Sequence, residues 1–348
     1  MPGSSVPKRV HESRTFRIAI AAAALVFLAL LFHSVGWSAI ASNVARVGRW
    51  FLFLVAIYTF AQAAFAYGWW LVLDPRLPRP SFPRFFGIYL AGDTANVAFP
   101  GNLAGEPLKA HLLRDAPGTA PAVASLTIHK HADMLAQWVF VALGVGIALW
   151  RFPLPTAVQV AAVATTLGLG AALLLLSWAL PRGAYSPLLR RLARWKLLRG
   201  RLERFVAPAE RVDMRITEFY AVGRRAFALS TLFCFAGWCG GLLETWIILR
   251  LLAPGSGWLH AFAIETLAMT INNVFLFVPG RVGTAEGVRV GIFVLLGLPA
   301  AQGAAYSVLR RGRELIWTLP GLGVLAAGRR KAVASPEPVA LPASEARP

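Results

Sequence analysis

Apolar stretches long enough to cross a lipid bilayer run through most of this 348-residue chain. The clearest extend over Trp50 to Leu73, Val158 to Leu180 and Ala226 to Leu249, and each is close to the roughly 20 residues that a membrane-spanning helix needs. The stretch from Ile18 to Phe32 is shorter, but Val35 to Ile40 extends it. This pattern predicts an all-α protein that crosses a membrane several times.

Two further apolar stretches are interrupted by polar residues, proline and glycine, and the two interruptions are alike. The first runs from Asn96 through Pro100-Gly101 to Gly105-Glu106, and the second from Asn273 through Pro279-Gly280 to Gly283 and Glu286. Downstream, the first copy is followed by Pro117, Ser125, Lys130 and Asp133, and the second by Pro299, Ser307, Arg311 and Glu314. We therefore predict an internal repeat, with copies at about 50–150 and 226–328. Apolar segments broken at corresponding places in two halves indicate a transporter-type site between the repeats.

Basic residues predict which parts of the chain face the cytoplasm. The connector 182–225 holds 12 Lys and Arg against four acids, the tail 1–17 carries four Lys and Arg, and 329–331 is entirely basic. By the positive-inside rule, all three lie in the cytoplasm. We accordingly expect a cytoplasmic tail over 1–17, one transmembrane domain over 18–330, and a disordered tail over 331–348, which is rich in proline, alanine and glutamate.

Counting crossings between these cytoplasmic marks leaves one segment in each half that cannot span. Arg84 and Arg182 are both predicted to be cytoplasmic, so the chain must cross the membrane an even number of times between them. This region has three apolar stretches, so one of them cannot span. The interrupted stretch, Phe82 to Leu103, is therefore predicted to return to its own side. The same count predicts that His260 to Leu298 enters the membrane from the outer side and returns to that side. The predicted fold is an all-α polytopic integral membrane protein with about six spanning helices plus two re-entrant broken-helix segments, arranged as an inverted-topology repeat.

Composition narrows the class of protein. With 57% hydrophobic and 15% charged residues and a mean hydropathy of +0.59, the chain is too apolar for a soluble protein. The net charge of +19 sets topology here, because a nucleic-acid site would need a basic soluble domain, and we expect no nucleic-acid partner.

Apolar residues three or four apart from Leu188 to Phe205 predict a basic amphipathic helix, lying on the membrane surface or against the protein. A cleaved signal peptide is the competing interpretation of the N-terminus.

Charged and small residues near the two interruptions form the candidate substrate-binding site. A charge at membrane depth costs a few kcal/mol, so such groups are normally paired, face a cavity and serve function. The positive end of a broken helix suits an anionic head group, and nearby basic residues would add to the attraction, among them Arg289, Arg310 and Arg313. Lys130 with Asp133 and Arg311 with Glu314 are spaced i,i+3 and can pair on one helix face. Structural pairing, in which these charges only hold the two segments in place, is the alternative. The candidates are Asn96, Gly101, Gly105, Glu106, Lys109, Lys130, Asp133, Asn273, Gly280, Arg281, Gly283, Glu286, Arg311 and Glu314.

Other ionisable residues in apolar segments are less informative. Glu244 lies in the middle of a span and faces either the same cavity or a buried partner. His129 and His131 are two apart on a helix and point to different faces, which favours a proton relay over a metal site. Motifs of nucleotide, zinc and serine-nucleophile chemistry are missing, so we expect no cofactor, no metal and no enzymatic activity. Acid/base chemistry by Glu106 and Glu286 on a lipid is the one catalytic alternative.

The residues around both interruptions also resemble a known family. They are Asn96, Pro100-Gly101, Gly105-Glu106-Pro107-Leu108-Lys109 with Leu112-Leu113, and then Pro279-Gly280, Gly283 and Glu286-Gly287. From about Arg17 to Arg330, the chain resembles the transmembrane, flippase-like domain of lysylphosphatidylglycerol synthases and its stand-alone bacterial relatives. The sequence has no counterpart of the aminoacyl-transfer domain of the bifunctional synthases, so lysyl transfer is not carried over. Lys130 also stands where the resemblance leads us to expect arginine, which weakens a bidentate phosphate contact there.

The resemblance implies a multi-pass protein of the bacterial inner membrane that moves a lipid or lipid-linked molecule between leaflets. One stand-alone branch is associated with hopanoid biosynthesis, and the length of the chain suits that branch. The expected partners are membrane lipids with an anionic head group or a hopanoid-like structure, together with lipid-biosynthesis proteins. A membrane-embedded lipid-modifying enzyme and a non-catalytic partner in lipid biosynthesis are the two alternatives.

Overall fold

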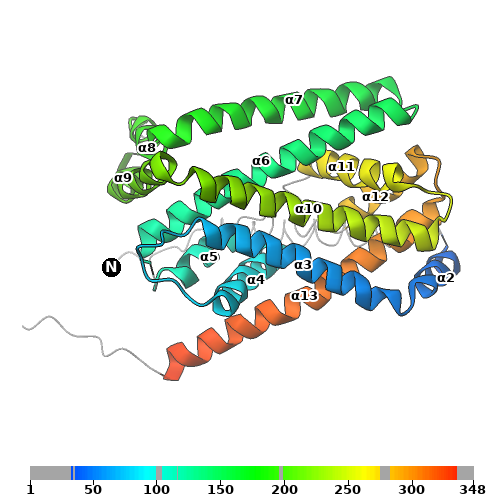
Figure 1. Ribbon diagram of the computed structural model, residues 1–348, viewed down its shortest axis with the longest axis horizontal. Coiled ribbons are helices and arrows are strands. Elements are labelled where there is room, and N and C mark those ends of the chain that lie inside the picture. Colours follow the sequence, from blue (N-terminus) through cyan, green and yellow to red (C-terminus); the bar gives the residue numbers. More distant parts are fainter. Residues whose placement is uncertain are drawn as a thin grey trace, which may run out of the picture.

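The computed structural model describes residues 33, 36–98, 104–115, 117–195, 199–274 and 283–334, with the backbone alone described at 98, 199–201, 272–274 and 328–334. Within these ranges the regular secondary structure is entirely helical (Figure 1). The helices are α2 (Trp37–Val47), α3 (Trp50–Leu71), α4 (Phe82–Ala98), α5 (Gly105–Leu113), α6 (Thr119–Arg151), α7 (Thr156–Ala179), the 3-10 turn η2 (Leu180–Arg182), α8 (Tyr185–Ala193), α9 (Arg199–Val222), α10 (Arg224–Leu252), α11 (Trp258–Val274), α12 (Thr284–Leu295) and α13 (Ala300–Ala334).

Four of the described helices are long and apolar enough to cross a membrane: α3, α6, α7 continued by η2, and α10. They coincide with the predicted spans and with the apolar stretch between Ala120 and Trp150. The helix α13 is 35 residues long, but the charges from Arg310 to Glu314 lower its hydropathy. The predicted first span, Ile18 to Phe32, lies outside the described residues. The all-α, multi-span class is therefore confirmed, with four spans recognised by length and composition.

The predicted extension of that first span through Val35 to Ile40 is wrong. Gly36 has φ 93° and ψ 115° and precedes a separate helix, α2, and no helix continues through a residue with a strongly positive φ. Ile40, Asn43 and Val47 of α2 are buried, whereas Trp37 is exposed. The segment after Gly36 is thus a short amphipathic helix, which lies at one end of the bundle (Figure 1).

The two interrupted segments each contain a pair of shorter helices that pack together. The first pair is α4 and α5, and the second is α11 and α12. The described parts of α4 and α11 have 17 residues each, below the roughly 20 residues typical of a spanning helix. The residues that join the helices of each pair, 99–103 and 275–282, lie outside the described ranges. Figure 1 shows α4 and α5 towards the end of the bundle that carries α8 and α9, and α11 and α12 towards the opposite end.

Small residues bring α3 and α10 together at the centre of the bundle. A Cβ added at Gly240 would come within 3.1 Å of the Ala61 side chain, and one at Gly68 within 3.1 Å of the Ser230 carbonyl oxygen. Close backbone approach through small residues is the usual way in which helices associate in lipid. Buried side chains on either side of this contact form two hydrophobic cores, one around Trp69 and Phe85 and the other around residues of α6, α10, α11, α12 and α13.

The connector forms two helices where the apolar spacing predicts one. Helix α8 ends at Ala193 and α9 begins at Arg199, and residues 196–198 between them are outside the description. The buried Asp213 carboxylate of α9 accepts hydrogen bonds from the backbone N–H groups of Tyr185 (3.0 Å) and Ser186 (2.7 Å). This contact satisfies donors at the start of α8 and fixes α8 against α9.

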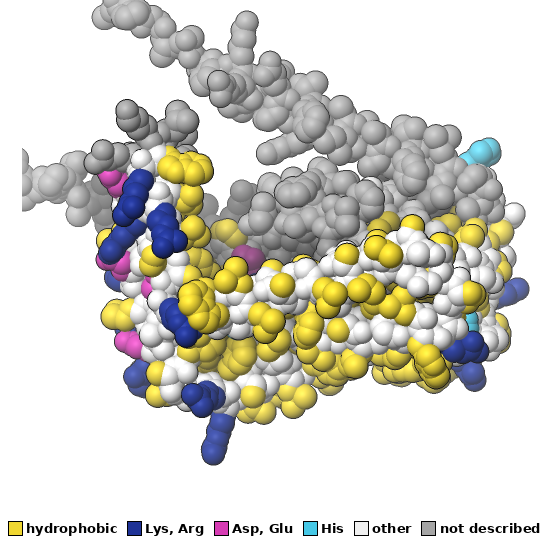
Figure 2. All heavy atoms as spheres, turned by 90° about the horizontal axis from the view of Figure 1, so that it is seen from above, with side chains coloured by type: hydrophobic (Ala, Val, Ile, Leu, Met, Phe, Trp, Pro, Cys, Tyr) yellow, Lys and Arg dark blue, Asp and Glu magenta, His cyan; other side chains and the backbone are white. Residues whose placement is uncertain are grey.

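Charged and apolar side chains are separated along the long axis of the molecule. Figure 2 shows Lys and Arg side chains gathered towards the two ends of the visible described surface, with a broad band of hydrophobic side chains between them. Large apolar side chains exposed on the surface of the molecule include Leu167, Leu174 and Leu175 of α7. An apolar band between basic ends is the surface expected of a membrane-embedded bundle.

Candidate functional site

The two helices of the first interrupted segment meet through Asn96 and Gly105. The Asn96 side-chain oxygen accepts a hydrogen bond of 2.7 Å from the backbone N–H of Gly105, which is one of the unpaired donors at the start of α5. Gly105 is buried against Gly92 of α4, and a Cβ at position 105 would overlap the Gly92 carbonyl oxygen. Glycine is therefore required at this crossing, and both predicted residues help to hold α4 and α5 together.

Four charged residues of the first repeat lie close to one another. Glu106 accepts a hydrogen bond of 3.2 Å from Lys109, and the Lys109 ammonium lies 4.6 Å from the centre of the Tyr89 ring. On α6, Lys130 pairs with Asp133 at 3.1 Å and interacts electrostatically with Glu106. Although it lies within a spanning helix, the Lys130 side chain is 52% exposed. This ammonium group therefore remains accessible to a ligand.

At the second interruption, Glu286 joins the start of α12 to α13. Gly283, with φ 80°, precedes α12, and its N–H donates a hydrogen bond of 2.7 Å to Glu286 Oε2. The other carboxylate oxygen accepts from Arg311 Nη2 at 2.6 Å and from Nε at 3.0 Å. Arg311 also binds Glu314 at 3.1 Å. Charge-assisted hydrogen bonds of this kind are among the stronger polar contacts in proteins.

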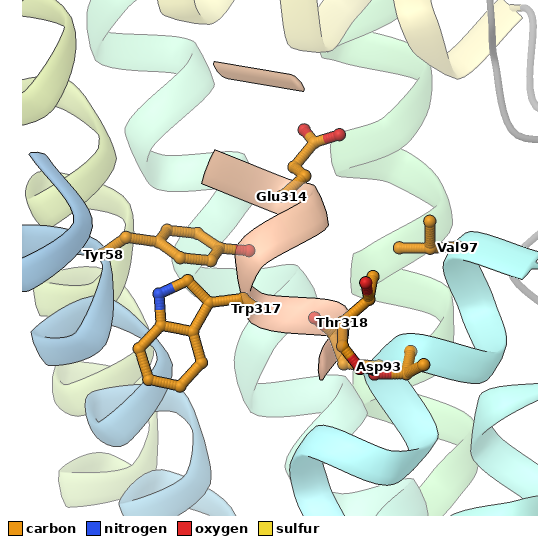
Figure 3. A pocket seen from close by; sticks show the side chains of 7 residues that line it. Tyr58, Asp93, Val97, Glu314, Trp317 and Thr318 are labelled. Atoms are coloured by element: carbon orange, nitrogen blue, oxygen red, sulfur yellow. Dashed lines mark hydrogen bonds between the residues drawn. The ribbon is translucent and has the colours of Figure 1, made fainter. Parts of the chain in front are cut away.

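A small cavity brings residues of the two predicted repeats together. It has a volume of about 20 Å³, close to the space that one water molecule needs. Asp93 on α4 and Glu314 on α13 both line it, and Figure 3 shows these side chains around the space with the Tyr58 hydroxyl directed at α13. Asp93 also accepts a hydrogen bond of 2.9 Å from Gln62 of α3. The remaining lining residues are Thr94, Val97, Trp317 and Thr318.

The predicted pairs Lys130 with Asp133 and Arg311 with Glu314 are thus present, and Arg311 brings Glu286 and Glu314 together. Gly101, Gly280 and Arg281 lie outside the described residues. Asn273 belongs to α11, but its side chain is likewise outside the description. Their membership of the site stays a prediction.

Comparison with known proteins identifies the family of this chain. Residues 15–321 match the sequence model of the lysylphosphatidylglycerol synthase TM region. The chain belongs to this family. One relative is a UPF0104 membrane protein of Methanothermobacter thermautotrophicus, which is 25% identical over 329 residues covering 89% of this chain and 92% of that protein. No solved structure matches the chain. The predicted resemblance is therefore confirmed, and the molecule is a membrane protein with several apolar helices.

This lysylphosphatidylglycerol synthase TM region also contains a buried ionic cluster that the sequence analysis recognised only in part. Glu265 of α11 accepts hydrogen bonds from Arg310, Thr245 and Tyr306. The sequence analysis overlooked Glu265, although an acid inside the apolar run from Ala261 to Leu267 is itself a signal of function. Glu244, whose environment was left open between a cavity and a buried partner, is buried and binds Arg313 at 2.8 Å.

The two histidines of α6 have structural partners. One His131 ring nitrogen lies 2.6 Å from the Tyr220 hydroxyl and the other lies 2.8 Å from the Ser177 hydroxyl. His129 is buried on another face, where Cys234 is its neighbour at 3.9 Å. In the part of the chain that the structure describes, no three His, Cys, Asp or Glu residues are grouped as metal ligands. Both histidines therefore fit a role in holding α6 to its neighbours.

Proposed function

We propose that this family member moves a lipid, or a lipid-linked molecule, between the leaflets of the membrane, and that the head group passes between the two interrupted segments. The observation that carries the proposal is the position of Glu314. It is joined through Arg311 to Glu286 of the second interruption, and it lines one cavity with Asp93, at the end of α4 where the first interruption begins.

Helix contacts support an inverted relation between the two repeats. In the first repeat α5 packs on α6, and in the second α12 packs on α13. The other helix of each pair packs on the long helix of the opposite repeat: α4 packs on α13, and α11 packs on α6. With the two pairs towards opposite ends of the bundle (Figure 1), this exchange is the arrangement that alternating access uses in transporters with inverted repeats.

Partial exposure of the site supports a substrate role for its charges. Pairing alone is what the structural alternative predicts, and Glu106 and Glu286 are indeed paired with neighbours. However, the side chains of Glu314 and Arg311 remain 25% and 24% exposed, and that of Lys130 is half exposed. This partial exposure leaves these charges within reach of a ligand.

The head group that fits is anionic, and side chains rather than helix ends would bind it. The Gly105 N–H is occupied by Asn96 and the Gly283 N–H by Glu286, so these donors at the two helix starts serve the protein itself. Lys130 supplies an accessible positive charge, and Arg311 can supply another by exchanging Glu286 or Glu314 for the head group. A phosphate or carboxylate of a lipid, including one of the hopanoid-linked or modified phospholipids of a bacterial inner membrane, has the complementary charge.

Transport requires α4 and α13 to separate. A volume of about 20 Å³ holds one water molecule and no lipid head group. Admitting a head group therefore means opening the contact between these helices, which includes a hydrogen bond of 3.4 Å from the Thr94 hydroxyl to the Thr318 carbonyl oxygen.

Reconstitution into vesicles tests the proposal. The vesicles carry a head-group-labelled anionic phospholipid, and the fraction reached by an added quencher reports exchange between leaflets. We expect exchange by the wild type, and its loss in Glu106→Gln and Glu286→Gln with membrane insertion intact. Glu210→Gln on the exposed surface of α9 is the matched control and should exchange normally. Full exchange by the double site variant would remove the assigned site, and a chemically altered lipid would instead indicate an enzyme.

A further inference from the structure

Seven ionised side chains form a continuous line through the second half of the bundle, and only part of this line belongs to the candidate site. Acids and arginines alternate along it, and every neighbouring pair is an ion pair. Glu265 and Glu286, at the two ends, each pair with one arginine, whereas Glu244 and Glu314 each pair with two. In order, the members of this ionic chain are Glu265, Arg310, Glu244, Arg313, Glu314, Arg311 and Glu286.

The ionic chain contains four carboxylates and three guanidinium groups. Arginine cannot lose its proton in a protein, so among these groups only the carboxylates can change their charge. Arg289 of α12 acts electrostatically on Glu265 and Glu314 at the two sides of the chain. The charged groups that face Glu244 are Arg310, Arg313 and Glu314 of α13 and Glu265 of α11, and Tyr58 of α3 lies beside them.

Glu244 is the carboxylate least well satisfied. Its side chain is 1% exposed, and one oxygen accepts from Arg313 at 2.8 Å. The other oxygen, Oε1, is buried and has no hydrogen-bond partner among the described residues. A buried carboxylate with an unpaired oxygen is unfavourable in its charged form. A proton on Oε1 removes that charge.

We propose that Glu244 is a proton-binding site and that Arg313 transmits its protonation state to the cavity. Arg313 lies between two acids, 2.8 Å from Glu244 and 3.9 Å from Glu314. When hydronium transfers a proton to the Glu244 carboxylate, leaving water, Arg313 loses its nearer anion and moves to Glu314. The three arginines of the ionic chain then pair one to one with Glu265, Glu314 and Glu286.

This exchange reaches the cavity through two groups. Glu314 lines the cavity directly, and the Arg313 guanidinium carbon lies 3.5 Å from the centre of the ring of Tyr58, another lining residue (Figure 3). Because α4 and α13 meet at this cavity, protonation of Glu244 alters the charge at the contact that must open. This inference rests on the proposed lipid transport, for which the proton is then the coupling ion.

Infrared pH titration of the full chain in lipid tests the proton site without depending on transport. The wild type should show the C=O band of a protonated buried carboxyl group, and Glu244→Gln should lack it, whereas Glu210→Gln should retain it. The same band in Glu244→Gln, or no titrating buried carboxyl in the wild type, would overturn the assignment. Helical content by circular dichroism verifies folding. If Glu244→Gln does not fold, Arg313→Lys serves instead, and an unchanged titration midpoint in that variant would contradict the proposal.

Vesicles with an imposed pH gradient test the coupling. For one proton per lipid, a gradient of one pH unit should change the leaflet distribution of the labelled lipid by up to about tenfold in the wild type and should have no effect in Glu244→Gln. Wild-type exchange that ignores the gradient overturns the coupling and leaves lipid transport standing. Absence of any wild-type exchange overturns the transport function, and the infrared titration still decides the proton site.

Discussion

The two halves predicted to be repeats use the same types of charged residue in different ways. In the first repeat the pairs are local: Glu106 binds Lys109 and Lys130 binds Asp133, each three residues along one helix. Such pairs can open without moving any helix. They are therefore suited to exchanging a protein partner for a substrate.

In the second repeat the principal pairs join different helices. Glu286 of α12 and Glu244 of α10 bind arginines of α13, and so does Glu265 of α11. Opening one of these pairs changes how α13 packs against its neighbours. The comparison teaches that similar motifs form local pairs in one half and interhelical pairs in the other, so that under the proposed function the first suit binding and the second also hold and switch α13.

The largest effect on stability should come from breaking an interhelical pair. Arg313→Ala leaves Glu244 buried without its partner at 2.8 Å, and losing one member of a buried pair costs about 3–5 kcal/mol. We expect a large fall in melting temperature in detergent. Replacing both residues, as Arg313→Met with Glu244→Met, should recover most of the loss, and failure to do so would show that the pair itself is not the cause.

The next effect should come from the crossing of α4 and α5. Gly105→Ala places a methyl group against the Gly92 carbonyl oxygen, and overpacking of this kind costs about 1–3 kcal/mol. Gly146→Ala is the matched control, because a Cβ there meets nothing within 4 Å. Melting temperatures should fall for the first variant and stay level or rise for the second. Equal behaviour would mean that α4 and α5 do not require this close approach.

A local pair should matter for transport more than for stability. Lys130→Gln removes a half-exposed charge, and an exposed ion pair contributes at most about 1 kcal/mol. Losing a hydrogen bond to a charged head group costs about 1.5–3 kcal/mol, so lipid exchange should slow by roughly tenfold or more. Parallel measurements of melting temperature and exchange rate check this. A stability loss as large as that of Arg313→Ala would contradict the distinction between the repeats.

The smallest effect is expected in the loop between α3 and α4. Hydrogen bonds from Arg76 hold the pKa of Asp74 below its usual value, and this exposed pair contributes at most about 1 kcal/mol. A lowered pKa stabilises the fold above the unfolded-state pKa of about 3.9, and the contribution is lost as the pH falls through the folded-state value. The small difference in melting temperature between wild type and Asp74→Asn should thus vanish in acid. A difference that persists there would have another cause.

Local patterns in the sequence were sufficient for much of the fold. Hydrophobic length identified α3, α7 and α10. The i,i+3 spacing predicted the pairs Lys130–Asp133 and Arg311–Glu314. In each of these cases the determining residues are neighbours along the chain, so no knowledge of packing is needed.

Features that depend on packing were missed or wrong. Arg310 and Glu265 are 45 residues apart, and Arg313 and Glu244 are 69 apart, so nothing local announces that they meet. The positive φ of Gly36, which ends the predicted extension of the first span, leaves no mark in hydropathy. The contact of Asp213 with the start of α8, 27 and 28 residues away along the chain, is likewise not visible in the local sequence.

The central claim is that a lipid head group passes where α4 meets α13. The most direct test joins Thr94→Cys to Thr318→Cys by a disulfide, in a chain whose Cys234 and Cys239 have been replaced by alanine, and measures lipid exchange before and after reduction. The account predicts no exchange while the disulfide holds the helices together and full recovery on reduction. Exchange at the full rate in the cross-linked protein would contradict it.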